Sequence, residues 1–137
     1  MSEFSKPAFI FIYIAAIAAV IIKGEGIVKI LTVPFFTLLF NTILRKILNK
    51  PRPFLRDDVI KLTEHKNSGS FPSNHACSSV IISLCYILVF PPLVPLFMLF
   101  SFFTGLSRVA TGVHYPADVF AGWSISILSG IIFFIFF

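Results

Sequence analysis

The sequence predicts an all-α fold, a polytopic membrane helix bundle of about five transmembrane helices. Of its 137 residues, 57% are hydrophobic and 12% are charged, and the mean hydropathy is +0.95. Soluble domains carry about 45–50% apolar and about 25% charged residues, and a chain this small buries only about 68–70% of its unfolded surface. The composition therefore excludes an ordinary soluble domain and a disordered chain. The two cysteines, Cys77 and Cys85, would lie about 12 Å apart along one helix, too far for a disulfide.

Apolar runs without charge mark the expected spans. The first covers residues 7–22, and the second covers 30–44, with a helix that begins near Ile27 and continues past Arg45. Residues 67–107 are long enough for two crossings, and Phe90-Pro91-Pro92 divides them because proline disrupts a helix interior. The last run covers 119–137. A membrane span needs about 20 residues, so several of these helices must include residues that flank the apolar run. We expect residues 1–137 to form one integral-membrane domain.

Positive charge is concentrated in one polar segment. The net charge is +5, and seven of the eleven Lys and Arg residues lie between Arg45 and Lys66. A short cytoplasmic loop that fixes membrane topology has this pattern, and so does a basic segment for nucleic acid. The membrane-like flanks offer no fold that reads a groove, so we expect no nucleic-acid partner.

Two short segments next to the expected helix ends suit an anion. In residues 45–54, two cations end the second helix, and Arg52 stands between two prolines, where its planar fork matches phosphate oxygens. Interfacial snorkelling explains the same cations equally well. In residues 69–76, a helix start offers backbone N–H groups to an anion, Ser73 adds a hydroxyl, and His75 can exchange a proton near pH 7. Here the alternative is a plain N-cap with an interfacial histidine.

A third segment, residues 107–118, combines a cation with a His–Asp pair. Arg108 ends a long apolar run, where a charge is costly without a partner or a ligand. His114 and Asp118 are four residues apart, and Pro116 suits the first position of the last helix. The carboxylate can hold one imidazole nitrogen and leave the other free to attack. A structural His–Asp pair is the alternative.

Counting crossings places all three segments on one membrane face. The second and fourth helices run toward that face, and the third and fifth leave it. We therefore expect one active site there, formed by residues that are distant in sequence.

The three segments resemble the signature of the type 2 phosphatidic acid phosphatase superfamily, whose membrane members dephosphorylate lipid phosphates and diphosphates. The family pattern reads K-x6-R-P, then P-S-G-H, then S-R-x5-H-x3-D. The matching positions here are Arg45-x6-Arg52-Pro53, Pro72-Ser73-Asn74-His75 and Ser107-Arg108-x5-His114-x3-Asp118. Arg45 replaces the usual lysine, so either Arg45 or the adjacent Lys46 takes that role, and Asn74 replaces the common glycine.

The resemblance implies a mechanism. His114 attacks phosphorus and forms a phosphohistidine, Asp118 orients His114, and His75 protonates the leaving oxygen. The implied phosphate-binding residues are Arg45 or Lys46, Arg52, Ser73, the backbone N–H of Asn74, and Arg108. No metal or other cofactor is implied, and the partners are the membrane and a lipid phosphate or diphosphate.

Several questions stay open at this stage. Undecaprenyl diphosphate is our first expectation for the substrate, with phosphatidylglycerol phosphate and phosphatidic acid as alternatives. Rival interpretations are a zinc site that would include His65, a small anion transporter or channel, and a haloperoxidase-like use of the pocket with vanadate, whose known relatives are soluble. We expect a multi-pass protein of the cell membrane with an extracytoplasmic active site, against the positive-inside tendency. The oligomeric state is open.

Overall fold

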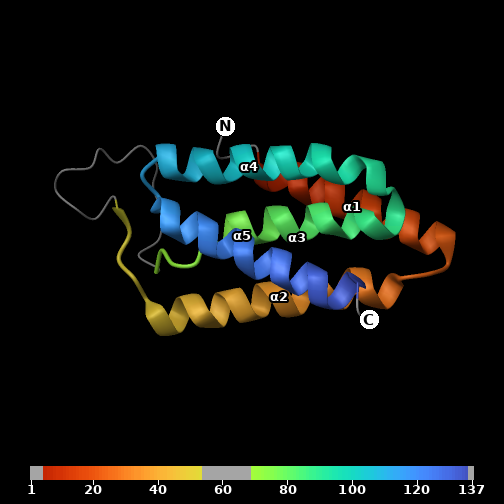
Figure 1. Ribbon diagram of the computed structural model, residues 1–137, viewed down its shortest axis with the longest axis horizontal. Helices are drawn as coiled ribbons and strands as arrows, with labels where there is room; N and C mark the ends of the chain where they lie inside the picture. The colour runs from red at the N-terminus through yellow and green to blue at the C-terminus, as the bar shows by residue number, and fades with distance from the viewer. Residues whose placement is uncertain (1–4, 54–68, 136–137) are drawn as a thin grey trace.

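The structure, a computed structural model, describes residues 5–53 and 69–135, and every regular element in these ranges is helical (Figure 1). The five main helices are α1 (Ser5–Lys23), α2 (Ile27–Leu48), α3 (Asn74–Val89), α4 (Val94–Ala110) and α5 (Pro116–Gly130). A 3₁₀ turn, Pro91–Leu93, joins α3 to α4, and a π-helical turn, Ile131–Ile135, follows α5. The prediction of an all-α bundle of about five helices is confirmed.

Glycine and proline set the helix boundaries. The turn from α1 to α2 contains Gly24 and Gly26, with φ of 78° and 83°, a left-handed conformation that glycine adopts without steric cost. The division at Pro91 and the start of α5 at Pro116 are as predicted. Helix α2 begins at Ile27 and continues through Pro34 as far as Leu48, which is also close to the prediction.

Helix α3 lies at the centre of the bundle and packs against each of the other four main helices (Figure 1). It is 16 residues long, and nine of them are buried, far more than in any neighbouring helix. This central position explains how a helix of this length can lie within the bundle, because the surrounding helices cover it along its length.

The outer helices present large apolar side chains outward. Phe11 of α1 is 74% exposed, Phe35 of α2 is 61% exposed and Phe120 of α5 is 62% exposed. Exposed apolar surface on this scale is typical of contact with lipid rather than with water. Three helical stretches are long and apolar enough to span a membrane, 27–48, 91–110 and 116–133, whereas α1 and α3 are shorter apolar helices. The protein is therefore a helical membrane protein.

Small and hydroxyl-bearing residues line the helix contacts inside the bundle. The hydroxyls of Ser83 on α3 and Ser101 on α4 are 2.9 Å apart, and the hydroxyl of Ser126 on α5 donates to the carbonyl of Cys77 at 2.6 Å. Such residues let membrane helices approach closely and supply hydrogen bonds between them. Cys77 and Cys85 are both buried and unpaired, as their spacing predicts.

Gly122 sets the distance between α5 and the start of α3. A Cβ atom at this position would lie 2.6 Å from the carbonyl oxygen of Ser73 and 3.1 Å from the amide nitrogen of Cys77. Both neighbours are backbone atoms, so they cannot move aside as a flexible side chain can. Gly122 therefore allows α5 to pack directly on the segment that precedes α3.

We predict that Gly122→Ala separates α5 from the beginning of α3 and destabilises the protein by about 1–3 kcal/mol, the usual cost of overpacking. Thermal unfolding in detergent measures the loss. Gly130→Ala is the matched control, because a Cβ there would meet only side-chain atoms of Leu84. Equal effects of the two substitutions would contradict a specific role for the backbone contact at Gly122.

Candidate active site

One end of the bundle collects the three polar segments. The C-terminal ends of α2 and α4 and the N-terminal ends of α3 and α5 lie together at the left of Figure 1. The predicted convergence of these helix ends on one side is confirmed. The structure brings together buried side chains from each segment, namely Arg52, Ser73, Arg108, His114 and Asp118.

His114 and Asp118 face each other inside this end of the bundle. The imidazole Nδ1 lies 3.6 Å from the carboxylate Oδ2, and the two side chains are almost fully buried. The same Oδ2 accepts a hydrogen bond from the backbone N–H of Tyr115 at 2.9 Å, which caps the start of α5. The backbone N–H of His114 in turn donates to the carbonyl of Arg108 at 3.2 Å. The last turn of α4 and the first turn of α5 thus fix the pair.

Lys50 contacts the other oxygen of the Asp118 carboxylate. Its Nζ lies 3.2 Å from Oδ1, and the same ammonium lies 4.5 Å from the centre of the Tyr115 ring. Lys50 belongs to none of the motif positions predicted from the sequence. The one sequence feature that could have indicated a role for Lys50 is its position two residues before Arg52. The linear sequence does not indicate which acidic residue it contacts.

Three arginines give the site a strong positive field. Arg108 is fully buried at the end of α4, Arg52 is 5% exposed, and Arg45 is partly buried near the end of α2. Burial, together with the charges of Arg45 and Arg108, lowers the pKa of Arg52 to about 10, while Asp118 opposes this shift. Like charges gathered in a buried site favour the binding of an anion, which relieves their repulsion.

The environment keeps the His114 imidazole neutral. Burial lowers the pKa of His114 below its ordinary value, Asp118 opposes this shift, and the positive charges of Arg52 and Arg45 add to it. A neutral imidazole has one nitrogen with a free lone pair. Since Nδ1 faces Asp118, the other nitrogen, Nε2, is the one available to attack.

The second segment is tied to its neighbours through both backbone and side chains. The backbone N–H of Ser73 donates to the carbonyl of Asp118 at 2.9 Å, and the Ser73 hydroxyl accepts from the N–H of Ala76 as the N-cap of α3. The Asn74 amide bonds to two α2 side chains, accepting from Asn41 and donating to Thr42 at 3.2 Å. A glycine, the common family residue, cannot make these contacts with α2.

Arg45 and Lys46 lie in different environments. Arg45 donates from Nε to the carbonyl of Gly69 and is near enough to His114 to lower its pKa. Lys46 is exposed and reaches only the edge of the polar pocket described below, and among the described residues it has no hydrogen bond such as that of Arg45 to Gly69. The helix persists to Leu48, and Asn49 ends it in a left-handed conformation with φ of 36°. This is the register in which Arg45, rather than Lys46, faces the site.

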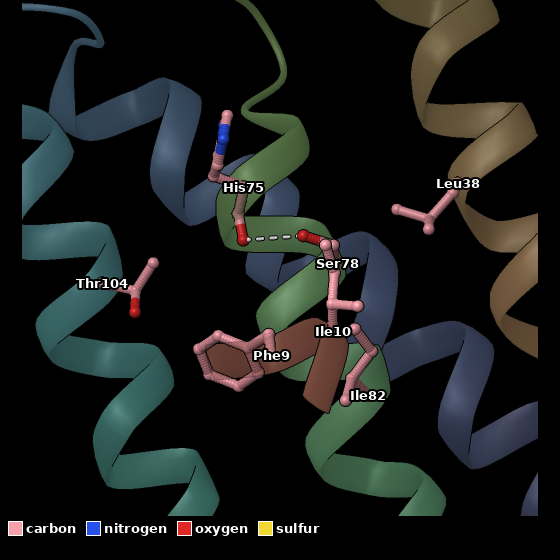
Figure 2. A pocket seen from close by; sticks show the side chains of 7 residues that line it. All are labelled: Phe9, Ile10, Leu38, His75, Ser78, Ile82 and Thr104. Carbon is pink, nitrogen blue, oxygen red and sulfur yellow. Dashed lines mark hydrogen bonds between the residues drawn. The ribbon is translucent and has the colours of Figure 1, made fainter. Parts of the chain in front are cut away.

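Neighbouring pockets with shared lining residues extend from Arg45, at the charged end of the bundle, to an apolar cavity. A polar pocket of about 450 Å³ is lined by Thr42, Arg45, Lys46, Asn49, Gly69 and Asn74. The apolar cavity of about 300 Å³ is lined by Phe9, Ile10, Leu38, His75, Ser78, Ile82 and Thr104 (Figure 2). A hollow of about 270 Å³ shares residues with both, including Asn74 and His75. His75 therefore lies where polar surroundings give way to apolar ones.

Some expectations fall on residues 54–68, which lie outside the described part of the chain. His65, one of the ligands in the zinc alternative, is among them. Within residues 5–53 and 69–135, no three His, Cys, Asp or Glu side chains gather as metal ligands would.

The fold and the site define a helical membrane protein in which arginines and a buried His–Asp pair gather at one end of the bundle. A family model described as the PAP2 superfamily matches residues 26–137, and the chain belongs to this family. The family expected from the three sequence segments is confirmed.

Curated relatives and solved structures agree with this assignment. The chain is 32% identical over 99 residues to undecaprenyl-diphosphatase BcrC of Bacillus subtilis, covering 72% of this chain and 51% of that protein. It is 30% identical over 112 residues to lipid A 1-phosphatase of Rhizobium johnstonii, covering 72% and 46%. The crystal structure of a PAP2-type phosphatidylglycerolphosphate phosphatase from Bacillus subtilis superposes with a TM-score of 0.69 at 25% identity, covering 99% of this chain and 70% of that one. The chain spans about half the length of the curated relatives it matches.

We predict that Arg45→Ala lowers kcat/KM for a phosphorylated lipid by roughly 10–150-fold, the equivalent of about 1.5–3 kcal/mol of charge-assisted hydrogen bonding. Lys46→Ala should cost far less because Lys46 is exposed, and Arg45→Lys should keep most activity. Steady-state phosphate release measures all three variants. The opposite order for the two alanine variants would show that the end of α2 is rotated relative to the described helix.

Proposed function

We propose that this protein is a metal-independent membrane lipid phosphatase that acts through a phosphohistidine on undecaprenyl diphosphate. The observation that carries the proposal is a row of pockets with shared lining residues, which extends from the polar pocket at Arg45, past Asn74 and His75, to an apolar cavity. A phosphate ester with an apolar chain fits this order of surroundings. The terminal phosphate would meet the arginines, the leaving oxygen, which bridges the two phosphates of a diphosphate, would lie near His75, and the chain would extend into the apolar cavity.

The proposed reaction proceeds in two steps. In the first, Nε2 of His114 attacks phosphorus, the bond from phosphorus to the leaving oxygen breaks, and His75 gives that oxygen a proton. In the second, water attacks the phosphohistidine, His75 takes a proton from the water, and the P–N bond breaks to release phosphate. Asp118 compensates the positive charge that develops on the imidazole, the role an aspartate has beside a catalytic histidine.

The arginines stabilise the transition state in this scheme. Charge on the transferring phosphoryl group is spread over its oxygens, and fixed cations in a buried site stabilise it without reorganising. Arg52 and Arg108 are buried at this end of the bundle, while Arg45 approaches from α2. The Ser73 hydroxyl and the N–H of Asn74, at the start of α3, complete the proposed phosphate site. These cations make a metal ion unnecessary for charge neutralisation.

Two observations favour a diphosphate over a monophosphate. The polar pocket that Arg45 lines offers a second cationic place for a phosphate, and it shares Thr42 and Asn74 with the hollow that His75 lines. The retained phosphate of a lipid diphosphate would occupy this pocket. A relative, BcrC, is named as an undecaprenyl-diphosphatase. Other relatives are named as phosphatases of lipid A, so the family likeness alone does not choose the lipid.

The test is phosphate release by the purified protein in detergent from undecaprenyl diphosphate, phosphatidylglycerol phosphate and phosphatidic acid. We expect the highest kcat/KM for undecaprenyl diphosphate, unchanged by a chelator. A preference for either other lipid would replace the proposed substrate. Absence of release from all three, by protein shown to be folded, would contradict phosphatase function and favour an anion transporter.

We predict that His114→Ala abolishes turnover while leaving the fold and lipid binding largely intact. Asp118→Asn should be less damaging but still severe, because loss of the orienting anion can cost about 10⁴ in kcat for a comparable triad. Phosphate release and thermal unfolding of each variant separate catalysis from stability. Activity of His114→Ala within tenfold of the unaltered protein would exclude it as the nucleophile.

We also propose that the active site lies on the extracytoplasmic side of the cell membrane. A cysteine introduced by Ala117→Cys, exposed at the start of α5, should react with an impermeant thiol reagent in intact cells. One introduced by Glu25→Cys, in the turn between α1 and α2, should react only after lysis. Cys77 and Cys85 are fully buried and give a low background. The reverse labelling pattern would place the site in the cytoplasm.

A further inference from the structure

Lys50 connects the three sequence segments that form the site. It belongs to the first segment, and its ammonium lies 5.6 Å from the centre of the Phe71 ring in the second. In the third segment it approaches the Tyr115 ring to 4.5 Å and the Asp118 carboxylate to 3.2 Å. A cation over an aromatic face is attracted by the ring quadrupole. Two rings and one carboxylate therefore hold an ammonium whose side chain is still 41% exposed.

The contact with Lys50 completes the fixation of the Asp118 carboxylate. Oδ2 is held by the N–H of Tyr115 and faces Nδ1 of His114, while Oδ1 is held by Lys50. With both oxygens engaged, the carboxylate cannot rotate about its Cβ–Cγ bond without losing one partner. Loss of Lys50 would leave Oδ1 without this partner and the carboxylate less constrained.

We propose that Lys50 is a positioning residue for catalysis, which fixes the Asp118 carboxylate against His114 and offsets part of its negative charge. The proposal rests on the phosphohistidine function proposed above. Lys50 acts through Asp118, and no contact between Lys50 and substrate is needed.

The charges around His114 determine the direction of the expected effect. The charges that act on the imidazole are those of Asp118 of α5, Arg52 of the segment after α2 and Arg45 of α2. Lys50 contacts the Asp118 carboxylate, and the backbone carbonyl of Arg108 accepts the N–H of His114. Removing the Lys50 charge leaves the Asp118 carboxylate less compensated, so the protonated imidazole becomes easier to form. The pKa of His114 should rise, and the acid limb of the kcat/KM profile should move to higher pH.

The experiment compares Lys50→Gln with Lys50→Arg, which keeps the charge. For Lys50→Gln we expect the acid limb to rise by about 0.5 pH unit, so that the additional loss of kcat/KM approaches about threefold at pH values well below the pKa of His114 and vanishes at about pH 8. The decrease should lie in kcat, with KM nearly unchanged, and Lys50→Arg should restore the original profile. Lys29→Gln, which removes a lysine from the other end of α2, is the matched control and should show no shift.

A titration of His114 by histidine-selective NMR in detergent gives a second readout that does not depend on turnover. His114→Ala identifies the signal among the three histidines. A higher titration midpoint of His114 in Lys50→Gln, but not in Lys50→Arg or Lys29→Gln, supports the proposal. It does so even if no tested lipid is hydrolysed. Failure to hydrolyse any lipid would by itself reject only the phosphatase function. An unchanged midpoint, or an increase in KM without a shift in the pH profile, would overturn the positioning role.

Discussion

Three segments of the chain meet at Asp118. Its carboxylate caps the first turn of α5 through Tyr115, faces the imidazole of His114 and pairs with Lys50, while its backbone carbonyl accepts the N–H of Ser73. One fully buried residue thus joins the segments that follow α2, precede α3 and precede α5. A buried carboxylate is costly unless it is paired and hydrogen-bonded. The contacts at this end of the bundle satisfy that requirement and fix the site.

The close packing of α5 on α3 makes this junction possible. Gly122 allows the backbone of α5 to approach the Ser73 carbonyl. One turn earlier on α5, the carbonyl of Asp118 accepts a hydrogen bond from the Ser73 N–H, which also joins α5 to the start of α3. Side-chain hydroxyls farther along α3, α4 and α5 continue the close contact toward the opposite end. In a membrane, packing and hydrogen bonds of this kind replace the hydrophobic driving force between helices.

The site combines a charged end with a route into apolar surroundings. Burial of Arg52, Arg108 and His114 at the bundle end strengthens their effect on an anion, because the local dielectric is low. The apolar cavity is lined on α3 by His75 and Ser78, in the first turns of that helix (Figure 2). A reactant held across this boundary would keep its charged part near the imidazole while its apolar part stays in surroundings like lipid. This arrangement is the physical basis of the proposed lipid phosphatase function.

The sequence by itself determined the helices, their order and the end of the bundle where the polar residues gather. Long apolar runs divided by Pro91, Gly24 and Pro116 suffice for this, because helix boundaries depend on local backbone chemistry. The motif spacing also identified the His114–Asp118 pair, which lies within one helical turn. Only the tertiary structure decided that Lys50 pairs with Asp118 and that Asn74 bonds to α2. These contacts join residues 68 and 33 positions apart, and pairing at such separations depends on how the helices pack rather than on local sequence.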